Sequence, residues 1–300
     1  MIKSIAFHSY KGGTGKTTIA ANFAALLAKK GYRVFLIDLD VYAPSLHTYF
    51  ETEPMKWFND FLNGTAEISD VLVDLTPTII NTDGNNNTVN GKLYACFCNP
   101  NKEEIYKLDY GGKQDSPRIQ LLRRIILLRE QIILKYDADY IIIDTSPGIR
   151  YWSINALGIA DTLFLTLKMG SLDIDGTKKM AHDIYSSFSK FGAKSYLLLN
   201  RMAGYCTPPG MMVNATSPSS LGSFHDTSHD NSHNSFQQES YYDVGGTFSK
   251  EVGMNIISSI PCYCDIQFST KEFLTVLKYP HHPFAKRLEA LAEDKHITIN

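Results

Sequence analysis

The stretch Lys11-Gly12-Gly13-Thr14-Gly15-Lys16-Thr17-Thr18 follows a short apolar run, 2–7, and opens a segment with helical spacing of apolar residues, 17–30. A strand, a glycine-rich turn and a helix in this order are the setting of a phosphate-binding loop. Glycines let backbone N–H groups close around an anion, and the start of the helix adds unpaired N–H groups and the positive end of its dipole. Lys16 is expected to contact the β- and γ-phosphates, and the Thr17 hydroxyl to coordinate Mg²⁺. The stretch therefore predicts a nucleoside triphosphate site.

The loop departs from the general nucleotide-binding pattern at its start. Tyr10 stands where that pattern has its first glycine, and a second lysine, Lys11, precedes the double glycine. This resembles the deviant Walker A loop of the MinD/ParA family of P-loop ATPases, whose relatives include nitrogenase iron proteins, cluster carriers and arsenite-pump ATPases. The resemblance implies ATP and Mg²⁺ as cofactors. It also implies an ATP-dependent homodimer in which Lys11 reaches across the interface to the partner's nucleotide.

Composition limits the class of protein. The 300 residues are 44% hydrophobic and 20% charged, as in ordinary globular proteins. A net charge of −2 gives no global attraction to nucleic acid, although a local basic face stays possible. The sequence shows no leader and no apolar run of membrane-spanning length, and its polar tail, 287–300, does not favour stable membrane anchoring. We expect a cytoplasmic protein.

Apolar runs typical of buried strands alternate with helical patterns, which predicts an α/β fold: a doubly wound, mostly parallel sheet flanked by helices. Within residues 1–300 we expect one P-loop ATPase domain, interrupted by a polar loop insertion at about 206–250. Loops are also expected at 81–91 and at 99–117, the latter ending in a helix start. The expected strands are 2–7, 33–38, 92–97, 140–144, 161–168, 195–200 and 256–261, and the expected helices are 17–30, 57–62, 68–72, 118–136, 175–191 and 285–293.

Carboxylates follow two of these strands. Asp38 and Asp40 end the second strand, and Asp144 ends the run Tyr140-Ile141-Ile142-Ile143 and precedes Thr145-Ser146-Pro147-Gly148. Ligands of such sheets bind at the carboxyl ends of the strands, so these groups are candidates for the Mg²⁺ shell, with Thr17. The resemblance implies that Asp38 and Asp40 lie in a first switch region, and that Asp40 acts in hydrolysis together with Lys11 and Lys16. It also implies that the segment ending at Gly148 is a second switch, in which the peptide of Gly148 rotates with the γ-phosphate.

Two further strand ends point to the base of the nucleotide. An amide side chain can pair with both a donor and an acceptor edge of a base, and Asn200 ends the strand 195–200. The resemblance implies that Asn200 hydrogen-bonds the adenine, with Arg201 beside it. It also implies that the backbone at Pro261 borders the base.

The cysteines and histidines leave a metal site open. Two Cys-x-Cys pairs occur, Cys96 with Cys98 and Cys262 with Cys264, and thiolates are good metal ligands. Alternate residues of a strand also share one face, and buried free cysteine is common, so the pairs favour buried structural cysteine over a metal site. His225, His229 and His233 recur every four residues, but the surrounding Ser, Asn and Asp disfavour a helix that would align them.

Three functions fit these patterns. The first is an ATP-hydrolysing dimer switch that positions DNA or a cellular structure through an unidentified protein partner. The second is an ATP-dependent metal or iron–sulfur cluster carrier, which requires the cysteines to bind metal. The third is a nucleotide-gated adaptor with negligible turnover.

Overall fold

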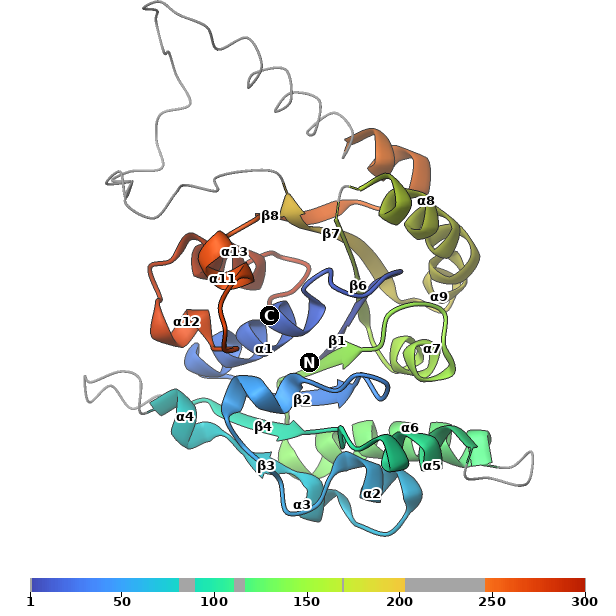
Figure 1. Cartoon of the computed structure of the whole chain (residues 1–300), viewed down its shortest axis with the longest axis vertical. Helices are drawn as coiled ribbons and strands as arrows, with labels where there is room; N and C mark the ends of the chain where they lie inside the picture. Colours follow the sequence, from blue (N-terminus) through green and yellow to red (C-terminus); the bar gives the residue numbers. More distant parts are fainter. Residues whose placement is uncertain (1, 81–89, 111–116, 169, 203–245, 300) are drawn as a thin grey trace, which may run out of the picture.

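A computed structural model describes residues 2–80, 90–110, 117–168, 170–202 and 246–299 (Figure 1). One sheet of eight strands runs through the described chain in the order β3-β4-β2-β5-β1-β6-β7-β8, parallel except for β3. The predicted doubly wound α/β fold is confirmed. The strands are β1 Lys3–His8, β2 Arg33–Leu39, β3 Val73–Asp74, β4 Lys92–Cys96, β5 Tyr140–Thr145, β6 Thr162–Leu167, β7 Lys194–Met202 and β8 Ile256–Pro261.

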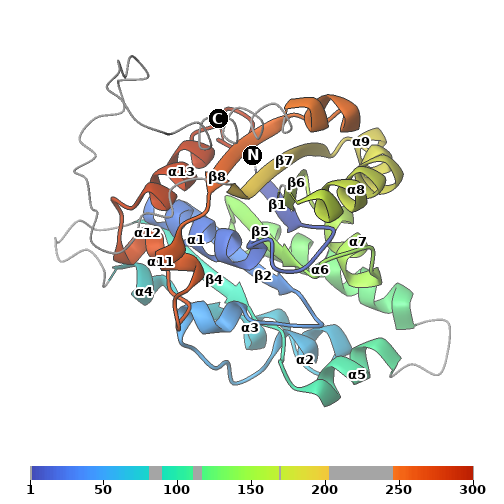
Figure 2. The same cartoon turned by 45° about the horizontal axis from the view of Figure 1, so that its top comes forward.

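The helices cover both faces of the sheet (Figure 2). One face packs against α1, α4, α12 and α13, and the other against α2, α3, α6 and α7, so the core has two apolar layers. The helices are α1 Lys16–Lys29, α2 Phe58–Asn63, α3 Ile68–Val71, α4 Thr76–Ile80, α5 Lys102–Tyr110, α6 Pro117–Tyr136, α7 Tyr151–Gly158, α8 Ser171–Met180, α9 Ser186–Lys190, α11 Cys264–Gln267, α12 Thr275–Lys278 and α13 Pro283–Ala292, with a 3-10 turn η1 at Leu46–Phe50 and a π-helical turn η2 at Ala181–Tyr185.

The central strands are buried on both sides, which explains their unbroken apolar runs. All six residues of β5 and of β6 are buried, since helices cover each face of a parallel sheet. The predicted site residues lie at the carboxyl ends of strands or in the loop and helix that follow β1. The phosphate loop follows β1, which lies between β5 and β6 at the middle of the sheet.

The opposite end of the sheet is closed by the last residues of the chain. The Lys3 ammonium donates to the carbonyl oxygens of His296 (3.0 Å) and Thr298, and the Tyr140 hydroxyl donates to the carbonyl of Ile297 (3.1 Å). The Ile297 side chain is fully buried. The amino ends of β1 and β5 are thus tied to residues about 150 to 300 positions later.

Three sequence expectations need correction. The segment 99–117, expected as a loop, contains α5, and α7 was not anticipated at all. In α6 the buried face consists of Leu121, Ile125, Leu128 and Ile132, whereas Ile119 and Ile126 are exposed. The insertion expected at about 206–250 lies mostly outside the described residues, as do His225, His229 and His233, but residues 246–252 form a helix and not a loop.

Of the helices in the described part of the chain, none combines the length and the apolar character that crossing a bilayer requires.

Candidate functional site

The phosphate loop has the backbone shape that its glycines predict. Gly13 and Gly15 lie in the left-handed region, with φ of 72° and 86°, where a side chain is disfavoured. Gly15 is also the N-cap of α1, so the loop leads directly into the positive end of the helix. Lys16, the first residue of α1, is 5% exposed and points into the protein.

Asn200 packs directly under this loop. Its Nδ2 donates to the carbonyl oxygen of Thr14 at 2.7 Å. A Cβ on Gly15 would lie 2.4 Å from the same Nδ2 atom, so the close approach of β7 also requires glycine there. In this structure the Asn200 amide therefore supports the phosphate loop, and its predicted pairing with adenine stays a prediction.

Two carboxylates lie beside Lys16 on neighbouring strands. Asp38 of β2 and Asp144 of β5 are paired in register, and both side chains are buried. Burial raises the pKa of Asp144 to about 7, although the Lys16 ammonium and the Thr17 hydroxyl favour its charged form. Burial, together with the charges of Asp144 and Asp40, raises the pKa of Asp38 well above its usual value. The carboxyl groups of Asp38 and Asp144 thus lie close together beneath the loop, where burial penalises their charged forms.

The oxygen atoms of this cluster fit Mg²⁺. Asp38 Oδ2 and Asp144 Oδ1 are buried and have no hydrogen-bond partner among the described residues. Mg²⁺ prefers oxygen ligands and is commonly held by one or two carboxylates together with the phosphates of its nucleotide. Asp38, Asp144 and Thr17 would hold the ion, as the sequence predicted.

Asp40 links the two predicted switches. Its Oδ1 atom accepts a hydrogen bond from the Ser146 hydroxyl at 2.7 Å, and its backbone N–H donates to Asp38 Oδ1 at 3.0 Å. Asp40 is 8% exposed, so it lies at the inner wall of the site and not in bulk solvent. The segments after β2 and after β5 are therefore joined by a hydrogen bond between their side chains.

Lys11 behaves differently from Lys16. Its side chain is 43% exposed, and its Nζ lies 4.0 Å from Asp173 Oδ1, in the first turn of α8. The two residues line a pocket of about 310 Å³ together with Gly12, Lys168, Gly170 and Leu172. The loop therefore buries Lys16 and leaves Lys11 exposed beside this pocket.

Sequence reasoning missed Lys168 and Asp173. The Lys168 Nζ lies 3.9 Å from the position that a Cβ would take on Gly13, which places a third lysine against the loop. The sequence gives no motif for either residue, because their positions depend on β6 lying beside β1.

Arg201 and Pro261 lie on the same side of the loop as Asn200. Arg201 has a φ of 52°, and its Nε lies 3.9 Å from the Cβ position on Gly15. Pro261 ends β8 opposite Met202 of β7. Arg201 therefore lies beside the loop, and the predicted contacts of Arg201 and Pro261 with the base stay predictions.

The four cysteines that the structure describes do not gather into one site. Cys96 and Cys98 are buried in the core at the end of β4, where burial raises the pKa of both thiols. Cys262 and Cys264 follow β8, and five strands lie between β4 and β8 in the sheet. Among the residues described, no group of three or more His, Cys, Asp or Glu side chains could hold a metal ion. A four-cysteine site within one chain is therefore not formed.

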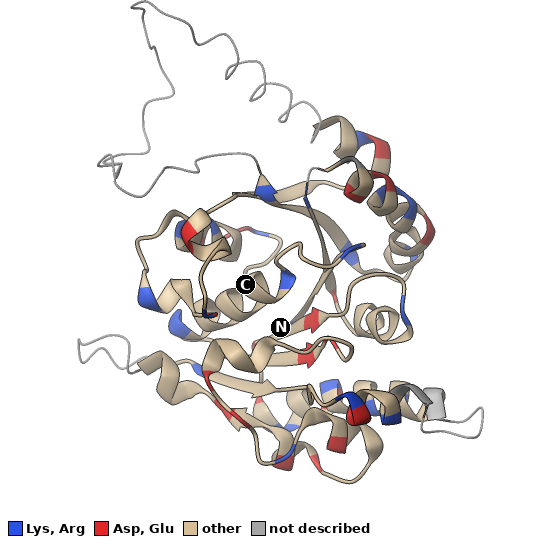
Figure 3. Ribbon diagram, in the orientation of Figure 1, with Lys and Arg blue, Asp and Glu red and all other residues tan. Residues whose placement is uncertain are grey.

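Charge on the described ribbon is mixed. Figure 3 shows Lys and Arg interspersed with Asp and Glu over the helices, without a basic stripe in that view. This agrees with the net charge of −2 and gives no support to nucleic-acid binding by this face.

Three features define a P-loop nucleotide-binding protein: a glycine-rich loop after the central strand, a buried lysine at the start of the next helix, and carboxylates at the ends of β2 and β5. A family model for the AAA domain, AAA_31, matches residues 2–192. The chain belongs to this family and is a MinD/ParA-like P-loop ATPase.

Individual relatives agree with this assignment. The chain is 28% identical over 207 residues to a putative replication protein A of Rhizobium rhizogenes, covering 64% of this chain and 47% of that protein. It is 26% identical over 186 residues to the sporulation initiation inhibitor protein Soj of Bacillus subtilis, covering 61% of this chain and 65% of that protein. The chain thus spans about half to two thirds of the length of these curated relatives.

Solved structures share the fold. The septum site-determining protein MinD of Pyrococcus horikoshii, complexed with Mg-ADP, superposes with a TM-score of 0.64 at 19% identity, covering 99% of this chain and 97% of that one. At this level of identity the likeness supports the fold alone.

Proposed function

We propose that this protein binds ATP with Mg²⁺, hydrolyses it and switches between a monomer and an ATP-dependent homodimer, acting in the partitioning or positioning of DNA or a cellular structure. The proposal takes its cellular role from relatives named for replication, sporulation control and septum placement. An unidentified protein partner would read the state of the switch.

The observation that carries the proposal is the contrast between the two loop lysines. Lys16 is buried near the charges of Asp144 and Asp40, where it can serve the phosphates of its own subunit. Lys11 is turned outward and is 43% exposed at the loop mouth, so it is available to a second subunit. A single site needs only the first lysine, whereas a dimer in which each subunit completes the other's site needs both.

The residues of the site have the following roles. The backbone of Gly12 to Thr18 and the Lys16 ammonium hold the phosphates, and Asp40 positions the attacking water. Mg²⁺, when bound, neutralises charge that develops on the phosphate oxygens. After hydrolysis the Ser146–Asp40 contact lets both switches relax together, because it joins them.

The test is the solution mass of the protein with ATP–Mg²⁺ and with ADP, in wild type, Lys11→Ala and Asp40→Ala. We expect ATP to double the mass of wild type, Lys11→Ala to stay monomeric and Asp40→Ala to stay dimeric because hydrolysis is slowed. Lys190→Ala, which removes an exposed lysine of α9, is the matched control and should behave as wild type. A mass that ignores the nucleotide in every variant would contradict the dimer switch.

Turnover measured in the same samples separates an enzyme from an adaptor. Phosphate release from ATP that depends on Asp40 supports hydrolysis. Dimerisation without phosphate release would instead identify a nucleotide-gated adaptor.

A further inference from the structure

The peptide groups around Gly148, in the predicted second switch, are held by the end of β1 on both sides. The Gly148 N–H donates to the carbonyl oxygen of Ser9 at 2.8 Å. Its carbonyl oxygen lies 3.0 Å from Nε2 of His8, the last residue of β1. Gly148 has a φ of 81°, so this double attachment fixes it in a conformation that glycine adopts readily.

The partners of His8 determine where its proton lies. A carbonyl oxygen can only accept, so Nε2 of His8 carries the hydrogen and donates it to Gly148. The other ring nitrogen, Nδ1, is then the acceptor and receives the hydroxyl hydrogen of Tyr185 at 3.0 Å. Burial lowers the pKa of His8 to about 4, which keeps the ring neutral and leaves one hydrogen to be assigned. Tyr185, His8 and Gly148 thus form one directional chain of hydrogen bonds.

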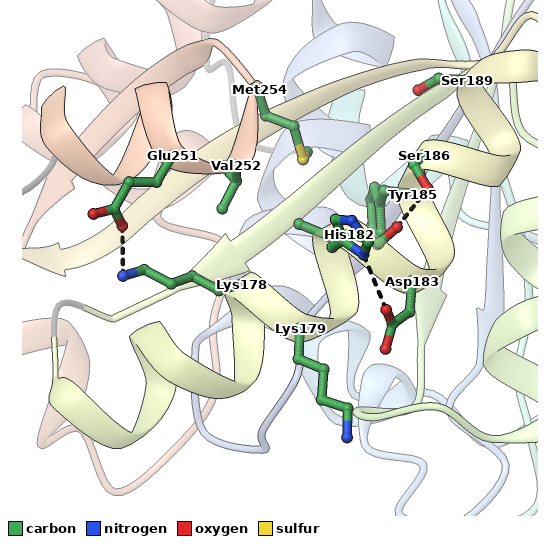
Figure 4. Close-up of a pocket in the computed structure, with 12 residues that line it drawn as sticks. Lys178, Lys179, His182, Asp183, Tyr185, Ser186, Ser189, Glu251, Val252 and Met254 are labelled. Carbon is green, nitrogen blue, oxygen red and sulfur yellow. Dashed lines mark hydrogen bonds and ion pairs between the residues drawn. The ribbon is translucent and has the colours of Figure 1, made fainter.

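Tyr185 belongs to the π-helical turn η2, between α8 and α9. π-Helical turns are rare and occur often at functional sites. The Tyr185 ring is 1% exposed and stacks with the His8 ring at 14°, with the ring centroids 6.1 Å apart. Figure 4 shows Tyr185 beside His182 on one wall of a pocket of about 710 Å³. Residues 251–254 line the opposite wall of this pocket. The turn thus reaches from the surface to the end of β1.

We propose that the chain Tyr185–His8–Gly148 is a latch that holds the second switch with the Gly148 N–H turned toward Ser9, and that His8 and Tyr185 are positioning residues for γ-phosphate recognition. The inference rests on the proposed ATP-dependent switch. If Gly148 turns its N–H toward a γ-phosphate, it must leave Ser9. Rotation of the following peptide would then remove the Gly148 carbonyl from His8. The latch therefore disfavours the binding of ATP but not the binding of ADP. The free energy of its hydrogen bonds determines how strongly the switch prefers ATP.

The test uses three variants: His8→Phe, Tyr185→Phe and the double variant. His8→Phe removes the donor to Gly148 and keeps a ring in the core. Tyr185→Phe removes only the hydroxyl that selects the tautomer of His8. Replacing both partners by apolar groups of similar shape is tolerated better than removing one, so the double variant guards against a folding defect.

The first readout needs no nucleotide. Hydrogen exchange of the backbone amides at 146 and 148–150 should become about fivefold faster in His8→Phe, the change expected for one lost hydrogen bond. Tyr185→Phe should show part of this effect. The double variant should not exceed His8→Phe, because the residues act in one chain. Exchange equal to wild type in both folded single variants would overturn the latch, whatever the protein does with ATP.

The second readout is the ratio of the dissociation constants for ADP and for a slowly hydrolysed ATP analogue. This ratio should rise about fivefold in His8→Phe. The substitution removes a hydrogen bond from the latched conformation, and the ATP-bound conformation does not contain that bond. Tyr140→Phe is the matched control, because it removes an equally buried tyrosine hydroxyl that donates to a carbonyl at the far end of the sheet. It should leave the ratio unchanged. A wild type that does not distinguish the two nucleotides would refute the proposed function, and the exchange measurement would still decide the latch.

Discussion

Asp38 places a carboxyl group in the protein interior, where burial penalises its charged form. A carboxyl whose pKa is higher in the folded protein than in the unfolded chain stabilises the fold fully below the unfolded pKa, and that stability is lost as pH rises through the folded pKa. The pKa of Asp38 is raised well above 3.8, first by burial. Its contribution therefore disfavours the fold at neutral and alkaline pH.

Asp38→Asn should therefore stabilise the nucleotide-free protein. The amide keeps the shape without the charge, and one unit of pKa shift corresponds to about 1.4 kcal/mol, so we expect a gain of about 1 kcal/mol or more at about pH 8 that vanishes near about pH 4. Urea unfolding without Mg²⁺ at several pH values measures it. Asp175→Asn, at an exposed position of α8, is the control and should change little. A gain that is constant with pH would contradict the explanation.

Gly15 combines two constraints at one residue. Gly15→Ala introduces a Cβ at φ 86° and at 2.4 Å from Asn200 Nδ2, so we expect a loss of about 1–2 kcal/mol from the backbone alone and more from the clash. Nucleotide affinity should fall at least tenfold, on the order of the 1.4 kcal/mol that separates decades of affinity. Gly192→Ala, with φ 94° and open space around the Cβ position, isolates the backbone contribution. Equal losses in the two variants would show that Asn200 does not constrain the loop.

The two kinds of residue differ in how far the sequence could predict them. Lys16, Asp38 and Asp144 were predicted because each belongs to a local pattern: a glycine-rich turn, or a carboxylate that ends an apolar strand. His8 and Tyr185 are 177 residues apart and carry no motif. Their contact arises only because β6 lies beside β1 and leads into α8 and η2.

At the scale of elements, α6 shows what periodicity can and cannot assign. Its position was predicted within one residue, but its buried face was not, because apolar residues surround much of the helix. Ile119 and Ile126 are 57% and 41% exposed, whereas Ile125 is fully buried. Which stripe faces the sheet depends on the register of α6 against α2 and α7, and a single helix sequence does not contain that information.

Neighbouring isoleucines of α6 give a direct test. Ile125→Ala should lower the free energy of unfolding by about 2–5 kcal/mol, because it leaves a cavity in the core. Ile126→Ala, with 41% of its side chain exposed, should change it by about 0.5 kcal/mol or less. Chemical denaturation of the two variants measures the difference. Similar losses in the two variants would contradict the assignment of Ile125 to the buried face of α6 and of Ile126 to its exposed face.

In the whole molecule, the candidate nucleotide site and the tail contacts that close the fold lie at opposite ends of one sheet. The site occupies the carboxyl ends of the strands, while the tail residues 294–298 close the amino ends through Lys3, Tyr140 and Ile297. This arrangement follows from the parallel direction of the strands, which the alternating pattern predicted. The closing role of the tail was not predicted, because the sequence pattern indicated only the preceding helix, 285–293.

Ile297→Ala should lower the melting temperature by several degrees without changing the dissociation constant for ATP more than about twofold, because the cavity lies at the end away from the loop. Calorimetry and nucleotide titration measure the two effects. Leu134→Ala, at a side chain that is 82% exposed, is the control and should change neither. A large loss of nucleotide affinity in Ile297→Ala would show that the two ends of the sheet are coupled.

The position of β1 has a consequence for synthesis on the ribosome. Its neighbours are β5 and β6, so Lys3 to His8 find their first strand partner only at Tyr140 to Asp144. At about 5–20 residues per second, β1 leaves the ribosome on the order of ten seconds before that partner exists. During this interval the apolar strand that carries the phosphate loop has no sheet to join. Chaperones that shield nascent apolar segments would therefore act on residues 3–8 long before the nucleotide site can form.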